Sequence, residues 1–269
     1  MLTHLQTRPP DQAEIAALFD TVADGMRRAV RERDPGRVPT FQLMLAGPDR
    51  ADVPPAPAYR PGLQREPEAR IAAAAARLES SLDRIHDASG TFVCRTWGVL
   101  GGVLLEVALM ADLHLMHGDG TLIPTGLFDS HVPRLNAWSR LMERAGAART
   151  ASLLLTQTRV TAPQALANGL CDAIHQESMQ DAGAPGPSVA RDPSREPVSG
   201  TALRLARELS ERTTRAGGLT PRQARVLERA AFALAFSCGD PKEGIAAFFS
   251  GRPARFTIDD GGARNPDER

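Results

Sequence analysis

The sequence predicts an α/β fold in which helices connect parallel strands. Residues 41–45 form a short apolar run that is typical of a buried strand, and residues 91–96 form a second run rich in β-branched and aromatic side chains. Between them, residues 68–86 are rich in alanine, the strongest helix former. A strand, a helix and a second strand in this order make a βαβ unit, whose two strands lie parallel in one sheet.

The chain before residue 41 predicts a short strand over residues 1–7 and then a long amphipathic helix over residues 11–33. Asp11 is a candidate N-cap for this helix, because its side chain can accept a hydrogen bond from a free backbone N–H. The apolar residues of the helix recur near helical spacing: Ile15, Leu18, Phe19, Val22 and Met26. Asp34-Pro35-Gly36 ends it, and residues 47–62 contain five prolines and are predicted to be a loop.

Residues 98–112, GVLGGVLLEVALMAD, follow the strand over 91–96 and predict a Gly-rich turn that opens an apolar helix. Gly101 and Gly102 have no side chains and allow close approach of the backbone. The free N–H groups and the dipole at the start of the helix suit an anion or a developing oxyanion. Glu106 lies among apolar residues, where a carboxylate is costly unless it is paired, and is a candidate acid/base.

Taken singly, these features have simpler explanations. A Gly-Gly pair before a helix is more often a plain turn, and a single glutamate in a helix more often lies on a solvated edge. The Gly-Gly pair and Glu106 become informative together with the residues that follow them. Asp112 ends the helix, and a predicted strand and turn, LHLMHGDGTL, come directly after it.

The second half of the chain is predicted to be mainly helical. Thr161 is a candidate N-cap, and Thr220-Pro221 is a cap followed by proline at the first helical position. Helices are predicted over residues 138–155, 162–168, 201–216, 220–236 and 244–249. The predicted organisation is a core over 1–175, a flexible linker over 176–200, a C-terminal helical region over 201–258 and a disordered tail over 259–269.

Composition excludes several classes of protein. The chain has 32 basic and 32 acidic residues, so no charge bias favours nucleic acid or a membrane surface. Its three cysteines are isolated and odd in number, which argues for a reducing compartment and against a disulfide framework or a zinc site. His114 and His117 lack a third ligand and are better explained as structural than as metal ligands. With no transmembrane run and no signal peptide in the sequence, we expect a cytoplasmic location.

Three ordered segments carry a resemblance to a known family. They are residues 98–112, residues 156–171 (TQTRVTAPQALANGLC) and residues 240–252 (DPKEGIAAFFSGR). Together they resemble the Gly-rich loop with its glutamate helix, the TG-x4-A-x2-A-x3-GLV segment and the D-x2-EG-x2-AF-x3-R segment of the enoyl-CoA hydratase/isomerase (crotonase) superfamily. The chain is identified as a divergent member. This resemblance implies a crotonase-like (ClpP/crotonase) spiral of ββα units with a C-terminal helical oligomerisation region, in a homotrimer or hexamer.

The resemblance also implies an activity on an acyl thioester, carried by CoA or by a carrier protein. Gly102 and Val103 would lie at the oxyanion hole, and the N–H of Val103 would take the place of the second oxyanion donor. Glu106 matches one catalytic glutamate. No cofactor is expected apart from the CoA that belongs to the substrate. Arg252, with Arg255, would approach a CoA phosphate, although solvated arginines near the chain end are an equally good explanation.

The sequence departs from the family pattern in ways that favour a second hypothesis. The first oxyanion donor falls on Pro54 or Pro55, and proline has no N–H to donate. The second catalytic glutamate falls on Gly126, where Asp129, or His131 close by, could substitute. The alternative function is therefore a catalytically degenerate subunit, kept for binding or assembly in a biosynthetic pathway.

Overall fold

The computed structural model describes the parts of the chain that build the sheets and their covering helices. The described residues are 2–6, 15–33, 38–47, 68–123, 135, 137–156, 158–179, 204–205, 226, 230, 234, 240–252 and 254–256. The predictions made for Pro54, Pro55, Gly126, Asp129 and His131 lie outside these residues. So do the tail over 259–269 and nearly all of the linker and of the helices predicted between residues 180 and 239.

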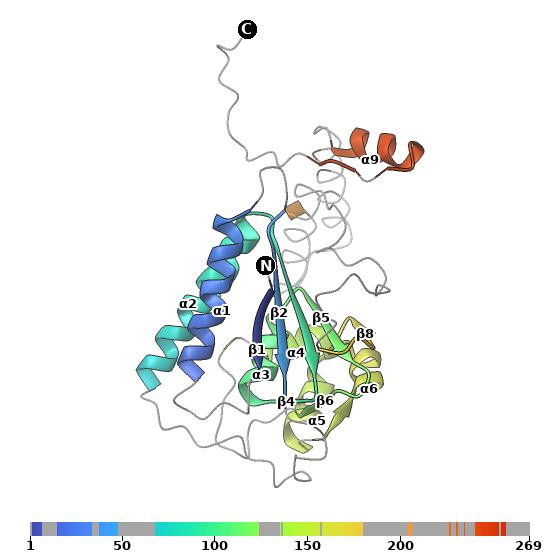
Figure 1. Ribbon diagram of the computed structural model, residues 1–269. Helices are drawn as coiled ribbons and strands as arrows, with labels where there is room; N and C mark the ends of the chain where they lie inside the picture. Colours follow the sequence, from blue (N-terminus) through green and yellow to red (C-terminus); the bar gives the residue numbers. More distant parts are fainter. Residues whose placement is uncertain are drawn as a thin grey trace.

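The fold is organised around a five-stranded parallel sheet with the strand order β1-β2-β3-β5-β8 (Figure 1). Every neighbouring pair in this sheet is parallel. The strands are β1 (Leu2–Gln6), β2 (Thr40–Ala46), β3 (Thr91–Trp97), β5 (Leu113–His117) and β8 (Ala173–His175). The strands predicted over 1–7, 41–45 and 91–96 are confirmed, and so is the parallel βαβ connection between the last two.

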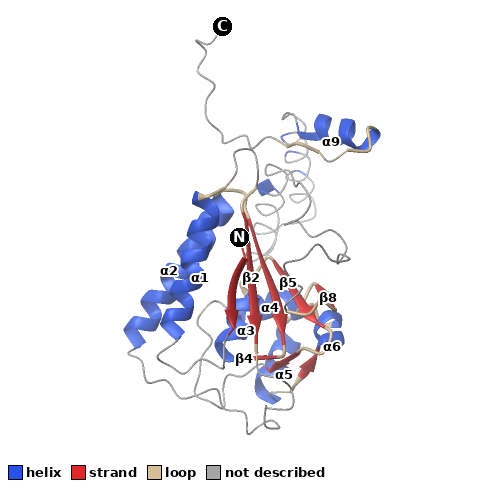
Figure 2. Cartoon of the chain, viewed as in Figure 1, coloured by secondary structure: helices blue, strands red, loops and turns tan. Residues whose placement is uncertain are grey.

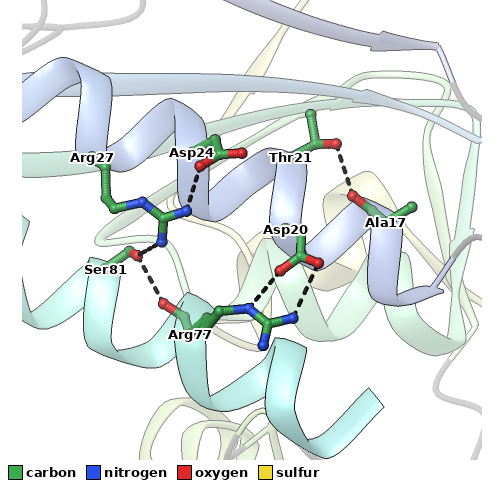
Figure 3. Close-up of polar contacts among 7 residues, drawn as sticks. All are labelled: Ala17, Asp20, Thr21, Asp24, Arg27, Arg77 and Ser81. Carbon is green, nitrogen blue, oxygen red and sulfur yellow. Dashed lines mark hydrogen bonds and ion pairs between the residues drawn. The ribbon is translucent and has the colours of Figure 1, made fainter. Parts of the chain in front are cut away.

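Two long helices, α1 (Ile15–Arg31) and α2 (Glu68–Asp87), pack side by side along this sheet (Figures 1 and 2). Their apolar residues share one core with alternate residues of β2 and β3, including Phe41 and Phe92, whose ring centroids are 5.3 Å apart. The outer surfaces of the two helices are joined by polar contacts (Figure 3). Arg77 donates two hydrogen bonds to Asp20, at 2.8 and 3.1 Å, but these side chains are exposed and water screens their attraction.

Asp112 and Asp172 make the same pair of hydrogen bonds to the neighbouring strand of the large sheet. This repetition is expected for a spiral of repeated units. Asp112 precedes β5; its Oδ2 accepts the N–H of Phe92 at 2.8 Å, and its own N–H donates to the Phe92 carbonyl at 2.9 Å. Asp172 precedes β8 and makes the equivalent pair of bonds with His114, at 2.7 and 2.8 Å. Each aspartate therefore fixes the start of its strand to the preceding strand of the sheet.

A second, smaller sheet has the order β4-β6-β7. Its strands are β4 (Val99–Gly101), β6 (Thr121–Ile123) and β7 (Val160–Thr161). The pair β4–β6 is parallel and the pair β6–β7 is antiparallel. The Gly-rich pattern of residues 98–102 predicted a turn here, and that prediction was wrong. The strand is only three residues long and gains its hydrogen bonds from β6, whose paired residues lie 22 positions further along the chain.

The remaining helices are α3 (Gly102–Leu109), α4 (Ala137–Ala145), α5 (Ala147–Thr156), α6 (Ala162–Ala167) and α9 (Asp240–Phe249). The single helix predicted over 138–155 is wrong, because Gly146 at φ 79° separates α4 from α5. Thr161 caps α6 as predicted, with its N–H bonded to the Gln164 side chain at 3.0 Å. The final helix begins four residues before the predicted start and lies well away from the sheet (Figure 1).

Gly47, at the end of β2, occupies a position without room for a side chain. Its N–H donates to the Trp97 carbonyl at 2.9 Å, and a Cβ would lie 1.9 Å from the Val99 carbonyl oxygen. Because that neighbour is backbone, it cannot turn aside. We expect Gly47→Ala to lower the free energy of unfolding by about 1–3 kcal/mol or more, measured by urea denaturation.

A matched control for this substitution is Gly244→Ala. Gly244 lies inside α9, and a Cβ there would meet its nearest atom, on the Phe256 ring, at an ordinary 3.7 Å. Alanine is the better helix former, so this variant should be neutral or slightly more stable. Equal stability of Gly47→Ala and wild type would contradict the packing argument.

Candidate functional site

The positive end of α3 lies where the two sheets meet. Gly98, at φ 68°, is the one residue between β3 in the large sheet and β4 in the small sheet. Its carbonyl accepts the N–H of Thr121, the first residue of β6, at 3.0 Å. The chain runs straight from β4 into α3, so the carboxyl end of one strand is followed at once by the first N–H groups of a helix.

The two glycines at this junction have different roles. Gly102, the first residue of α3, has φ 51°, a conformation that L side chains rarely adopt. Gly101 is extended, with φ −142° and ψ 169°, and provides no side-chain cap. The first turn of α3 contains no acidic residue, so no carboxylate of its own neutralises the positive helix end.

Val103 follows in the first turn, and only 8% of the residue is exposed. Its side chain belongs to the main apolar core. Val103 therefore contributes to the packing of α3 in the core.

Glu106 is buried, with 4% of the residue exposed, in a helix whose eight residues are all buried. The alternative of a solvated edge position is therefore wrong. The backbone N–H of Leu135 donates to Glu106 Oε2 at 3.2 Å, so the carboxylate also holds the chain just before α4. Residues three apart lie on the same side of a helix, which brings the Glu106 side chain to the side of α3 where Val103 lies.

Arg252 does not belong to the cluster formed by the start of α3 and Glu106. It follows α9, and its guanidinium makes two hydrogen bonds to the Glu243 carboxylate, at 2.6 and 2.9 Å. The N–H of Arg255 donates to the same carboxylate at 2.6 Å. These bonds, that of Arg252 foremost, lower the pKa of Glu243 to about 2. A phosphate would have to compete with this carboxylate, so phosphate binding by Arg252 stays a prediction, as does any role of Asp129.

A second polar group, on the face of the large sheet opposite the main core, was not found by the sequence analysis. Arg95 of β3 is 1% exposed and pairs with Glu177 at 2.7 Å. The Trp97 indole N–H donates to the Glu177 carbonyl at 2.9 Å, and His117 and His175 lie at the ends of the next two strands. A buried arginine two residues before a tryptophan in an apolar strand was the signal that could have revealed it.

The two histidines considered as metal ligands lie on opposite faces of β5. His114 is fully buried, with Nε2 3.0 Å from Thr96 Oγ1 and Nδ1 3.0 Å from the Leu170 carbonyl. Burial lowers its pKa to about 4, so it is neutral near pH 7. Within the described ranges, no three His, Cys, Asp or Glu side chains gather to hold a metal ion, and no helix has the length and apolar character needed to cross a membrane.

Comparison with solved structures identifies the fold. An enoyl-CoA hydratase from Bacillus anthracis aligns over 94% of this chain and 94% of its own, with a TM-score of 0.65 and 17% identity. An enoyl-CoA hydratase/isomerase from Cupriavidus metallidurans covers 95% and 91%, with a TM-score of 0.63 and 19% identity. DspI of Pseudomonas aeruginosa covers 87% and 86%, with a TM-score of 0.62 and 21% identity.

No family model and no curated protein matches the sequence. The chain has the crotonase fold of these hydratase and isomerase structures, and the predicted resemblance is confirmed at the level of the fold.

Proposed function

We propose that this protein acts on an acyl thioester, in a reaction of the enoyl-CoA hydratase/isomerase type. The observation that supports it best is the position of Glu106. It is a buried carboxylate one turn along from the N–H groups that begin α3. In a fold shared with structures named enoyl-CoA hydratases, this arrangement joins a proton carrier to a positive helix end.

In the proposed mechanism, the thioester carbonyl oxygen lies at the start of α3. The backbone N–H of Val103 and the helix dipole stabilise the negative charge that develops on this oxygen. The Glu106 carboxylate removes a proton from the carbon next to the carbonyl, leaving an enolate, and returns the proton to that carbon or to a conjugated one. No resident cofactor takes part, and CoA or a carrier protein enters as part of the substrate.

With a single glutamate, relocation of a proton or a decarboxylation-type step is nearly as well supported as hydration. Hydration needs a second group to activate or protonate water, and the corresponding position is Gly126. Asp129 is the proposed substitute.

A second candidate is a binding or assembly subunit without catalysis, retained in a biosynthetic pathway. The Glu106–Leu135 hydrogen bond favours it, because a carboxylate that anchors a backbone segment has a structural reason to be present. Pro54 and Pro55, where the family has a backbone donor, point the same way.

A panel of saturated, enoyl and aromatic acyl-CoA esters separates the two candidates. Thermal shift reports binding and spectrophotometry reports turnover on the same preparation. Turnover of at least one ester would support the enzyme, binding without turnover would support the binding subunit, and neither would leave only the fold. The same acyl groups attached to a carrier protein instead of CoA test whether the substrate is a carrier-protein thioester.

We also propose a homotrimer or hexamer in the cytoplasm. Ile245 and Phe249 are four residues apart on α9 and are 53% and 83% exposed, so one side of this helix presents apolar surface. We expect light scattering at micromolar concentration to give the mass of three or six chains, and Phe249→Asp to reduce it. Leu155→Asp, at an exposed apolar residue of α5, is the control. A monomeric mass for the wild type would contradict the prediction.

A further inference from the structure

Residues 176–179, which follow β8, are bound to the face of the large sheet that lies opposite the main core. We call this face the polar face and these four residues the clasp. The Glu177 carboxylate pairs with Arg95 of β3 at 2.7 Å, and the Glu177 carbonyl accepts the Trp97 indole N–H at 2.9 Å. Met179 packs against Trp97 and against Met44 of β2. The clasp thereby ties the chain that leads to the C-terminal region to the two central strands.

His175, the last residue of β8, lies next to these attachments and is 3% exposed. Its ring packs edge-on against Trp97, at 4.8 Å between centroids, and against His117 of β5, at 5.5 Å. Within the described part of the chain, neither of its ring nitrogens makes a hydrogen bond of ordinary geometry, although the Thr96 backbone is close enough to favour the protonated ring. Among the described residues, the titratable groups whose charges act on it are Arg95 of β3 and His117 and His114 of β5, and Glu177 of the clasp is the partner of Arg95.

We propose that His175 is a proton-operated switch that holds the clasp closed when the ring is neutral and opens it when the ring is protonated. A protonated imidazole in this position would be a buried cation beside a second cation, Arg95. The Glu177 carboxylate of the clasp is already paired with Arg95, so it does not neutralise a second cation at His175. Opening the clasp brings water to His175 and removes this conflict.

The direction of the pH dependence follows from this geometry. Burial, and after it the Arg95 cation, lower the pKa of His175 from 6.5 to about 4. In an open clasp the ring would titrate at its ordinary value. Between these two values the open form binds more protons, so the clasp is most stable above pH 6.5 and loosens as the pH falls toward 4. Within this window the open fraction should rise by up to about tenfold per pH unit.

Trp97 reports the state of the clasp directly. The sequence has two tryptophans, so Trp138→Phe leaves Trp97 as the single emitter. We expect its emission to shift reversibly to longer wavelength between pH 6.5 and 4.5, as water reaches the indole, while far-UV circular dichroism stays constant. His175→Phe in the same background keeps the ring contacts but cannot take a proton, and its emission should not move. His117→Phe, the matched control, should still shift, at the same or a slightly higher pH, because it removes a charge that opposes protonation of His175.

A second variant connects the switch to the ion pair. Glu177→Gln weakens the attachment to Arg95, so its emission should already be shifted at pH 7.5. The proposal is overturned by an emission shift that persists in His175→Phe, or by a parent whose emission does not change above pH 4.5. It is also overturned if circular dichroism is lost in step with emission, because global unfolding would then explain the shift. If His175→Phe does not fold, His175→Gln decides by the same outcomes.

Discussion

Replacing Glu106 by glutamine is expected to reduce turnover by about 10²–10⁴-fold on any acyl thioester that the wild type converts. Glutamine has the shape of glutamate, and its amide oxygen can still accept the N–H of Leu135, which Glu106 Oε2 now accepts at 3.2 Å. The amide cannot take up a proton at neutral pH. The melting temperature should stay the same or rise, because a buried carboxylate is costlier than a neutral amide of the same size.

A purely structural role for Glu106 predicts the opposite pair of results. Removing its charge would then weaken the hydrogen bond from the Leu135 N–H, because a carboxylate is a stronger acceptor than an amide, and turnover would fall only as far as the folded fraction falls. Melting temperature and turnover are therefore measured on the same preparation. Glu143→Gln, at an exposed position of α4, is the control and should change neither quantity. A Glu106→Gln variant that melts lower and keeps near-wild-type turnover would exclude the catalytic role.

Local sequence patterns predicted the elements whose own residues determine them. The alanine-rich run became α2, and the β-branched run after it became β3, in parallel with β2. The three-residue strand β4 was missed, because its existence depends on pairing with β6 and its glycines favoured a turn. The break between α4 and α5 was missed because a single glycine inside a helical pattern does not reveal its φ.

In the candidate site, too, features set by local sequence could be predicted and features set by long-range contacts could not. Glu106 could be recognised because a carboxylate among apolar residues is anomalous in any helix. Its partner Leu135 could not be recognised, since the two are 29 residues apart and meet only through the fold. The polar face was missed for the same reason, because Arg95 finds its carboxylate 82 residues later in the chain. The sequence therefore revealed Glu106 as an unusual residue, but it did not reveal the group that binds its carboxylate.

The ion pair between Arg95 and Glu177 is expected to give the largest stability effect of any surface or buried pair described here. Arg95→Leu should lower the free energy of unfolding by about 3–5 kcal/mol, because it leaves the Glu177 carboxylate without its cation in a largely buried position. Glu177→Leu should also destabilise, since it leaves a guanidinium that is 2% exposed without this carboxylate. Urea denaturation at pH 7.5 measures both.

The double variant Arg95→Leu/Glu177→Leu is the informative one. Replacing both partners of a buried ion pair by apolar residues removes both desolvation costs, so the double variant should be more stable than either single variant and close to wild type. The coupling between the two positions, the difference between the double variant and the summed single variants, should then be several kcal/mol. The exposed pair Asp20–Arg77, changed in the same way, should show much weaker coupling (Figure 3). Additive effects at Arg95 and Glu177 would mean that the pair does not hold the clasp to the sheet.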